Sequence, residues 1–582
     1  MLRRFLGAAL VPLGFATLLH AAPMLRLATA AVVPVPLPVG ANGGTQVVEA
    51  YNAGDGSLSL SIGASVSWIV TTIGSPRGCA TTTASATCIP LQIALNTSAL
   101  AAGTYNATVT VGGAANVVDA PQTITVTVRI GGVNVYVAPG STSDVTFTGN
   151  NPLIGSATTQ DGNRWLSLSQ NGSGSFRFSV PYRIHVAPPS SMAQGTYTGS
   201  LVTSGSSFVP DDQTIPVTMH ITAQPIAQPS PDHVTARLAQ GAAPLAFQIS
   251  PNNLGQGTLT MGAVSATTTD GGSWLTATAN PGGWAALTLD PGTLAPGYYT
   301  GLVSIASNAV NGTVTAPVSF QVVAQGAPLA YYGGVLDNAI FGIDGAGVSP
   351  GDIVALFGEQ LTLGGAVQAS SVPAPTLLGG ATVLVNGRAA PLYYVSYGQI
   401  NLELPLETAV GTAQIQIQRD GLTGNTVSVQ VVSRAPRILL LGGGFGAILN
   451  AADQSVPAPV GYFGPGLASH PAKAGDVLTI YTIGMGPTNP AVGTNVPAPS
   501  TEPLARLTTC PASQPCVGPV VEFGSGIFGT MSVTPAYAGL TPTYVGLYQV
   551  NVTIPGGIAS GLVNVTLVFP DSESNTAQIA VQ

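Results

Sequence analysis

The sequence predicts an all-β protein built as a tandem array of about five β-sandwiches. Apolar and polar residues alternate through many short segments, most clearly at residues 545–555, and a period of two is typical of a strand with one buried face. No segment sustains the apolar spacing of three and four residues that an amphipathic helix needs. The 582 residues are too many for one core, and a sandwich uses roughly 100 residues, so about five domains are expected.

The composition is that of a folded protein with a weakly charged surface. Hydrophobic residues make up 45% of the chain, which is ample for packed cores, and 73 glycines and 47 prolines suit many turns. Charged residues are only 7% of the total and the net charge is -8. We therefore expect neither nucleic acid nor an anionic membrane as a partner, because no basic patch is available to neutralise phosphates.

Residues 1–30 are predicted to be a signal peptide. Arg3 and Arg4 form a short positive region, and residues 5–19 form an apolar core. Cleavage after Ala22 and cleavage after Ala30 both fit the sequence, and ordinary secretion is favoured over the twin-arginine route. No later stretch reaches the roughly 18 to 20 apolar residues that cross a bilayer. The mature chain is expected to be exported, to the extracellular space, the cell surface or the periplasm, without a transmembrane span.

The four cysteines form two local pairs, Cys79 with Cys88 and Cys510 with Cys516. Export favours a disulfide within each pair, and each disulfide would staple a small loop. The alternative is one metal site, which needs all four residues to converge. They lie in the first and last predicted domains and lack neighbouring histidines, so disulfides are the favoured interpretation.

Three units of about 100 residues follow, at 31–130, 131–224 and 225–325. Each contains a Trp followed by an aliphatic residue and, later, a Gly-x-Tyr that enters an alternating strand: Trp68 and Tyr105, Trp165 and Tyr197, Trp274 and Tyr299. Each unit closes on a strand rich in Thr and Val, at residues 122–130, 213–221 and 315–323. Because these tryptophans recur, we expect them to be core residues.

The order of Trp, aliphatic residue, spacer and Leu-x-x-Gly-x-Tyr resembles the BACON family of bacterial immunoglobulin-like domains. The resemblance covers about half of the chain and rests on a short motif. It implies a sandwich of seven or eight strands, of a kind often found beside carbohydrate-active modules. It does not imply catalysis.

The rest of the chain contains an internal duplication, which predicts two related domains at 329–434 and 435–582. Residues 395–405, VSYGQINLELP, match residues 545–555, VGLYQVNVTIP. Residues 350–358, PGDIVALFG, likewise match residues 474–484, AGDVLTIYTIG.

This region resembles a C-terminal domain pair found in many exported proteins of soil acidobacteria, of the Solibacter type. The matching blocks occur in the same order, at residues 349–358, 385–392, 396–401, 446–450, 481–490, 537–540 and 546–552. Each half also looks like the IPT/TIG type of immunoglobulin-like domain. The sequence departs from the family pattern around Cys510 and Cys516 and at residues 336–347. The family has no established activity, so the resemblance implies architecture alone.

No motif commits the chain to a reaction. Ser or Cys catalysis needs a base within hydrogen-bond reach, yet no histidine accompanies a GxSxG elbow, and those of the mature chain lie in different units or connections: His185, His220, His233 and His470. No pair of carboxylates is marked out for glycosidase chemistry. We predict no catalytic residue, cofactor or metal ligand.

Three other features have a structural and a ligand-binding interpretation. Asp352 and Asp476 each follow Gly before an apolar strand, where a turn role is favoured over calcium ligation. The glycines of residues 442–446 suggest a hairpin turn more than a phosphate loop, because no helix pattern follows. The repeated Gln-x-Asn could bind a polar ligand, but amides bonded within the protein are the favoured interpretation.

Trp284 and Tyr298 are the candidate ligand platform, because exposed aromatic rings can stack on sugar rings. Trp284 follows an Asn-Pro-Gly-Gly turn and has no aromatic counterpart in the first unit. The alternative is that its ring packs under a loop. The sequence thus predicts a non-enzymatic adhesion or spacer protein whose partners are polysaccharide or surface proteins. A carbohydrate-binding protein is the second interpretation, and an enzyme with a site between domains is the third.

Overall fold

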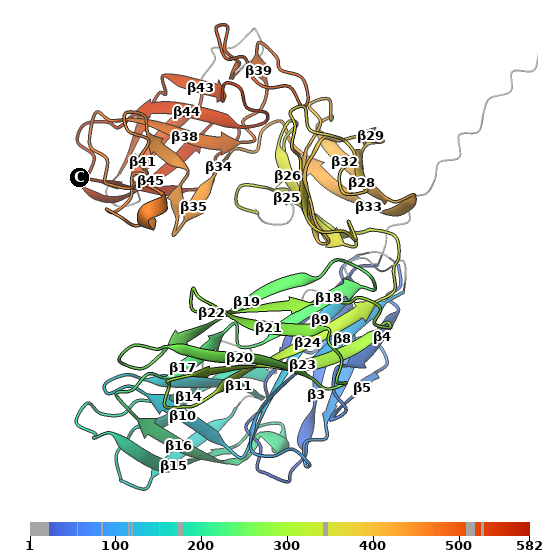
Figure 1. The fold of residues 1–582 in the computed structure, drawn as a ribbon, viewed down its shortest axis with the longest axis vertical. Coiled ribbons are helices and arrows are strands. Elements are labelled where there is room, and N and C mark those ends of the chain that lie inside the picture. The colour runs from blue at the N-terminus through green and yellow to red at the C-terminus, as the bar shows by residue number, and fades with distance from the viewer. Residues whose placement is uncertain are drawn as a thin grey trace, which may run out of the picture. The chain divides into compact units, whose positions relative to one another are not determined.

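The computed structural model describes residues 23–54, 56–82, 85–114, 117, 120–150, 152–170, 179–341, 347–507, 518–524 and 529–582. Within them the chain forms strands β1 to β46 and two short 3-10 helices, η1 (Val209–Asp211) and η2 (Gly464–Gly466). The predicted all-β array of tandem sandwiches is therefore confirmed (Figure 1). Most of the predicted signal peptide, residues 1–22, lies outside the described residues.

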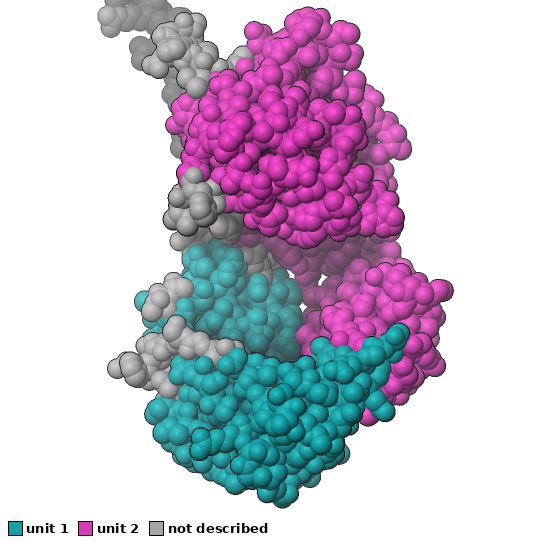
Figure 2. Space-filling model, turned by 90° about the vertical axis from the view of Figure 1, so that its left-hand side faces the viewer, with its two compact units in different colours: residues 1–226, 254–258 teal, residues 227–253, 259–582 magenta. Residues whose placement is uncertain are grey.

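The chain forms two compact units, residues 1–226 with 254–258, and residues 227–253 with 259–582 (Figure 2). Besides a small cluster of Phe445, Val456 and Ala458, the described residues form five large hydrophobic cores, with buried members mainly within residues 25–130, 133–221, 234–322, 330–431 and 438–581. Each core lies between two sheets, as in a β-sandwich. The first unit holds two sandwiches and the second unit holds three.

The first sandwich is drawn in blue in Figure 1. One sheet is ordered β1 (Leu25–Leu27), β3 (Gly43–Asn52), β7 (Thr87–Leu95) and β5 (Ile69–Ile73), with β6 (Arg77–Gly78) also on β7. The other is ordered β2 (Ala31–Val32), β9 (Gln122–Ile130), β8 (Gly103–Gly113) and β4 (Leu60–Ala64).

The second and third sandwiches repeat this arrangement. In the second, one sheet is β10 (Val133–Val137), β16 (Thr214–Ile221), β15 (Gly195–Ser204) and β12 (Ile154–Thr159), and the other is β11 (Ser143–Asn150), β14 (Ser179–Val186) and β13 (Leu166–Gln170). In the third, one sheet is β17 (Ala227–Ser230), β19 (Leu245–Asn253), β22 (Trp284–Leu289) and β21 (Leu275–Asn280), and the other is β18 (Val234–Ala239), β24 (Val314–Val323), β23 (Gly297–Ser307) and β20 (Met261–Thr268).

In all three, a strand near the start of the sandwich runs parallel to the last strand: β2 on β9, β10 on β16 and β18 on β24. The closing strands lie where the Thr- and Val-rich segments predict them. On β9, for example, Ile124, Val126 and Val128 are buried and alternate with partly exposed threonines. This alternation follows directly from the period of two in the sequence.

The first sandwich begins before the predicted boundary at residue 31. Leu25 is fully buried, and β1 pairs antiparallel with β3. Cleavage of a signal peptide after Ala22 would keep this strand, whereas cleavage after Ala30 would remove it. The sequence pattern missed β1 because the strand is only three residues long, too short for a periodicity.

The fourth sandwich contains one sheet ordered β25 (Leu329–Asp337), β26 (Ile353–Glu359), β31 (Gln399–Glu403), β30 (Leu392–Val395) and β27 (Val367–Gln368). Its second sheet is ordered β29 (Arg388–Ala389), β28 (Ala381–Val385), β32 (Gly411–Arg419) and β33 (Leu422–Val431).

The fifth sandwich contains one sheet ordered β34 (Arg437–Ile438), β38 (Val477–Ile483), β44 (Tyr548–Thr553), β43 (Tyr537–Leu540), β40 (Arg506–Leu507) and β39 (Thr488–Asn489), with β37 (Ile448–Asn450) also on β38. Its second sheet is ordered β35 (Leu440–Gly442), β36 (Phe445–Gly446), β46 (Ala577–Val581), β45 (Gly561–Val568), β41 (Val520–Gly524) and β42 (Thr530–Val533).

Candidate functional sites

The repeated tryptophans are structural. Trp165 and Trp274 are buried in the second and third cores, and each indole Nε1 donates to the Asp four residues earlier, at 3.1 Å in both cases. Trp68 is partly buried against the first core. The expected core role is therefore confirmed for Trp165 and Trp274.

The repeated Gly-x-Tyr places a tyrosine at the start of β8, β15 and β23. Each hydroxyl donates to the carbonyl oxygen of the alanine four residues earlier, at 3.1, 3.0 and 2.8 Å: Tyr105 to Ala101, Tyr197 to Ala193 and Tyr299 to Ala295. This resembles the tyrosine corner of immunoglobulin-like sandwiches, which fixes the connection before such a strand. The tyrosine of each motif therefore has a structural role inside its own sandwich.

Trp284 packs against its own turn. It is half-buried at the start of β22 and pairs with Asn280 across the turn, and its ring lies over Gly282, where a Cβ would collide with it. This favours the packing interpretation over the ligand platform. Tyr298 lies on β23 opposite Gln321, and its side chain lies outside the described residues.

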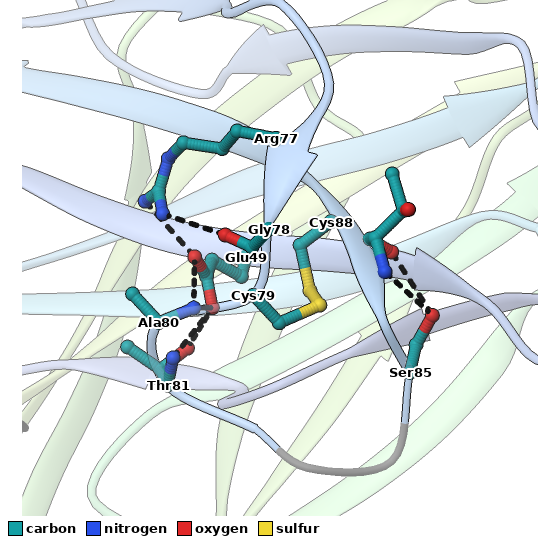
Figure 3. Close-up of a disulfide and its surroundings, with 9 residues drawn as sticks. Glu49, Arg77, Gly78, Cys79, Ala80, Thr81, Ser85 and Cys88 are labelled. Carbon is teal, nitrogen blue, oxygen red and sulfur yellow. Dashed lines mark hydrogen bonds and ion pairs between the residues drawn. A yellow bond between two sulfur atoms is a disulfide. The ribbon is translucent and has the colours of Figure 1, made fainter.

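The Cys79–Cys88 disulfide is present, with a Cα–Cα distance of 4.9 Å, and it closes a loop around the buried Glu49 of β3 (Figure 3). The Glu49 carboxylate accepts from the backbone N–H of Ala80 and Thr81 and from the Thr81 hydroxyl, and Arg77 lies 2.9 Å away. Burial alone would raise the pKa of Glu49, but these contacts hold that pKa below its usual range. The site is a loop staple. Cys510 and Cys516 lie outside the described residues.

The internal duplication is visible in individual hydrogen bonds. Asp352 Oδ2 accepts from the N–H of Ser349 at 3.0 Å, and Asp476 Oδ2 accepts from the N–H of Lys473 at 3.0 Å, three residues earlier in both copies. The predicted turn role is confirmed.

The Gln-x-Asn pairs also bond internally. The Gln399 amide donates to Asn401 Oδ1 at 2.7 Å, and the Gln549 amide donates to Asn551 Oδ1 at 3.3 Å. Amides that satisfy each other along a strand support the structural interpretation.

The glycine-rich segment is a hairpin between β35 and β36, as predicted. It lies under an aromatic loop whose Tyr462 is 50% exposed. A Cβ on Gly443, whose φ is +58°, would collide with the Tyr462 hydroxyl. The Tyr462 ring also packs on the buried Phe445 and on Phe463, with centroid distances of 4.8 and 5.0 Å. The fifth sandwich thus holds a rigidly supported, half-exposed tyrosine that the sequence did not single out.

His470 lies at the base of the same loop and is not isolated. Its Nε2 lies 2.8 Å from Asp453 Oδ2 and 2.9 Å from the hydroxyl of the buried Ser455, which in turn donates to Asp453 Oδ1 at 2.7 Å. Its Nδ1 lies 3.0 Å from the Pro471 carbonyl oxygen. The pKa of His470 is raised, by Pro471 first and then by Asp453.

This Ser, His and Asp cluster does not have the geometry of nucleophilic catalysis. A serine nucleophile needs imidazole Nε2 as a proton acceptor and Nδ1–H on the carboxylate. Here Asp453 and Ser455 share Nε2, and the Pro471 carbonyl needs a proton on Nδ1. The imidazolium form satisfies both nitrogens, so the cluster is an ion pair that closes the loop.

The fourth and fifth sandwiches meet at a polar junction. Asn495 of the fifth sandwich exchanges two hydrogen bonds of 2.7 Å with the backbone of Ala374 in the fourth. Its own N–H donates to Glu403 Oε2 at 2.8 Å. The Thr494 hydroxyl accepts from the N–H of Leu406 at 2.9 Å and donates to Glu407 at 2.8 Å. These contacts fix residues 494–495 against the end of β31.

Two buried carboxyls of the fourth sandwich have unusual proton affinities. Burial raises the pKa of Glu403 to about 7, against the opposing effects of Asn495 and Tyr393. Burial likewise raises the pKa of Asp352 to about 7, against the hydrogen bond from Ser349. Asp352 Oδ1 has no hydrogen-bond partner among the described residues. No sequence pattern predicts either pKa shift, because the burial of these carboxyls depends on distant segments.

A cavity of 220 Å³ opens at the junction, lined by Glu403 and Tyr548 and otherwise mainly by small apolar residues. In the described ranges, no group of three or more His, Cys, Asp or Glu residues could hold a metal ion. The described residues contain no helix that is long and apolar enough to cross a membrane.

The chain matches no protein-family model and no curated protein sequence. Among solved structures it is similar to Drosophila N-cadherin EC1-4, with 11% identity, coverage of 69% of this chain and 100% of that chain, and a TM-score of 0.20. The human desmocollin-1 ectodomain has 12% identity, coverage of 71% and 79%, and a TM-score of 0.15.

An endo-fucoidan hydrolase, MfFcnA4 from glycoside hydrolase family 107, has 12% identity, coverage of 50% of this chain and 43% of that chain, and a TM-score of 0.14. The chain therefore spans less than half of that hydrolase. At these identities the likeness concerns the immunoglobulin-like fold alone, and the low TM-scores carry no argument about function.

Proposed function

We propose that the chain is an exported, non-enzymatic adhesion protein. Its first three sandwiches act as a spacer, and its last two provide the recognition surface. This proposal rests on a difference in the exposure and bonding of aromatic side chains. In the first three sandwiches the recurring tyrosines, Trp165 and Trp274 are hydrogen-bonded inside their own sandwiches, and Trp68 packs against the first core. The fifth sandwich instead holds the half-exposed Tyr462 on a braced loop.

The spacer assignment follows from the repeated architecture. We assign the first three sandwiches to a BACON-like type, supported by their recurring Trp and Gly-x-Tyr, and the last two to an IPT/TIG-like type, supported by their duplication. Sandwiches with separate cores and short connections can be joined in series without sharing a site. Such an array suits a protein that holds a binding surface away from its attachment point.

Export is supported by the Cys79–Cys88 disulfide, because disulfides persist mainly in oxidising compartments. The fully buried Leu25 favours signal cleavage after Ala22, since that position preserves β1. The protein to study is therefore residues 23–582.

Carbohydrate binding is the second candidate, and the Tyr462 loop favours it. A half-exposed aromatic ring offers an apolar face to a sugar. The loop is braced, because Ser469 Oγ accepts from the N–H of Tyr462 and donates to the Pro459 carbonyl, both at 3.0 Å. A braced ring loses little conformational entropy on binding.

A glycan array together with retention on insoluble polysaccharides tests the proposal, using residues 23–582 and two matched variants. We expect Tyr462→Ala to lose most retention on any polysaccharide that the parent protein binds, and Trp284→Ala to keep it. The opposite pattern would place the recognition surface in the third sandwich. If the parent protein binds no glycan, carbohydrate binding is wrong, and retention on intact cells would then test adhesion through protein partners.

A further inference from the structure

The junction cavity is formed by segments from both C-terminal sandwiches. The fourth contributes Gly351, Glu403 and Leu406, and the fifth contributes mainly residues 486–496 and 545–548. Its walls are largely apolar, and Ala491 lies at the mouth, since it both lines the cavity and is exposed. An apolar cavity of about 150 Å³ is enough to hold benzene. The 220 Å³ here has room for one ring with a short substituent.

Glu403 is the acidic group of this cavity and is only 1% exposed. Among the described residues, its side-chain hydrogen bonds both go to Oε2, from the N–H of Asn495 at 2.8 Å and from the Tyr393 hydroxyl at 3.4 Å. Oε1 is therefore the oxygen left to receive a ligand. The Tyr548 hydroxyl is engaged by the Gly486 carbonyl, at 2.7 Å.

Glu403 has no cation in direct contact among the described residues. Arg434 and Asp352 act on its neighbour Tyr548 from behind the cavity wall, and neither lines the cavity. The titratable groups near it are Tyr393 from β30, Glu407 from the turn after β31 and Tyr548 from β44. Arg388 lies 2.9 Å from Glu407, and no Arg or Lys is among the described residues that line the cavity. A buried carboxylate without a cation is costly, and a ligand that brings a cation would offset that cost.

We propose that the cavity between the fourth and fifth sandwiches binds a small organic amine, with its ammonium group on Glu403 and an apolar body of about one ring against the surrounding residues. The ammonium would donate to Oε1, and the ring would replace the water of the apolar part. Because ammonium binding needs ionised Glu403, affinity should rise from pH 6 to pH 8. Tyr462 does not line this cavity, so the inference stands apart from the proposed adhesion surface.

Calorimetric titration of residues 23–582 with benzylamine at pH 8 tests this assignment, with benzyl alcohol as the neutral ligand of the same shape. We expect saturable binding of benzylamine that is weaker for benzyl alcohol and weaker at pH 6. The Glu403→Gln variant should lose about tenfold or more in affinity, because the ammonium loses its charged partner. Glu522→Gln, on β41 and outside the cavity lining, should bind as the parent protein does.

Ala491→Trp provides a second test that leaves Glu403 in place. A Trp at this exposed position should fill the mouth of the cavity and abolish benzylamine binding without loss of folding. Absence of saturable binding to the parent protein would overturn the proposal. Equal affinity for benzylamine and benzyl alcohol, or undiminished binding by the folded Glu403→Gln or Ala491→Trp variant, would also overturn it.

Discussion

Glu49 of the first sandwich and Glu403 of the fourth are both buried strand residues, but their environments shift the pKa in opposite directions. Glu49 receives two backbone N–H groups, a hydroxyl and an arginine from the disulfide loop. Glu403 receives one backbone N–H and a distant phenol. The environment of Glu49 in the first sandwich thus favours the ionised carboxylate, whereas the junction of the last two sandwiches favours protonated Glu403.

The two glutamates should therefore give opposite pH dependences. The lowered pKa of Glu49 stabilises the fold above its unfolded pKa near 4.5, and that contribution is lost as the pH falls through the folded value. For Glu403, the folded state keeps its proton up to about pH 7, while the unfolded chain loses it near 4.5. Stability therefore falls as the pH rises across this window.

The largest effect should come from a core tryptophan of the spacer. Trp165→Ala removes a side chain that is 1% exposed, together with its bond to Asp161. We expect a loss of about 3 to 5 kcal/mol in the free energy of unfolding. Trp284→Ala, at a half-buried turn, should cost clearly less. Urea denaturation followed by tryptophan fluorescence measures both, because all four tryptophans lie in the first three sandwiches. Equal losses would contradict the different roles given to these residues.

The next effect concerns the uncompensated carboxyl. Glu403→Gln should remove a pH-dependent destabilisation on the order of 3 kcal/mol between pH 4.5 and 7. The last two sandwiches contain no tryptophan, so tryptophan fluorescence does not report their unfolding. Calorimetry can follow it instead. The parent protein should show a lower transition temperature at pH 8 than at pH 5.5, and the variant a smaller difference. An unchanged difference in the variant would show that another group, such as Asp352, dominates.

Removing the staple around Glu49 should have a somewhat smaller effect. The Cys79→Ser, Cys88→Ser double variant opens a short loop, with nine residues of sequence separation. We expect a loss of about 2 to 3 kcal/mol from the first sandwich. Reduction of the parent protein should give the same loss if this disulfide carries it. A larger loss on reduction would point to a second disulfide.

The smallest effect should come from a single tyrosine corner. Tyr197→Phe keeps the ring and removes the hydrogen bond to Ala193, so we expect a loss of about 1 kcal/mol. Tyr462→Phe is the matched variant in the recognition loop and should leave spacer stability unchanged. Fluorescence-detected unfolding checks both, and a neutral Tyr197→Phe would mean that the corner adds nothing to stability.

Local patterns in the sequence predicted much of the fold. The alternation of apolar and polar residues predicted the closing strands such as β9. The match between residues 350–358 and 474–484 predicted that Asp352 and Asp476 have equivalent turn roles. Both are short-range signals that one segment contains by itself. The recurrence of Trp165 and Trp274 likewise indicated a core role, because a repeated position is shaped by a repeated environment.

The candidate sites were not predictable in the same way. Asn495 bonds to Ala374, which is 121 residues away in the sequence. No local sequence pattern predicts such a contact. The sequence does not link His470 to Asp453 and Ser455, because they lie on the other side of a Pro-rich loop. No repeat pointed to Tyr462. For Trp284 the sequence left a ligand platform and packing under a loop both open, and its ring lies over Gly282 of its own turn.

The most direct test of the proposed function is the release of reducing sugar from a panel of insoluble polysaccharides incubated with residues 23–582. A non-enzymatic adhesion protein should release none from any polymer, including those that retain it. Release that grows with time and with protein concentration would contradict the account, and loss of that release on substitution of His470 or Glu403 would locate the activity in the C-terminal pair.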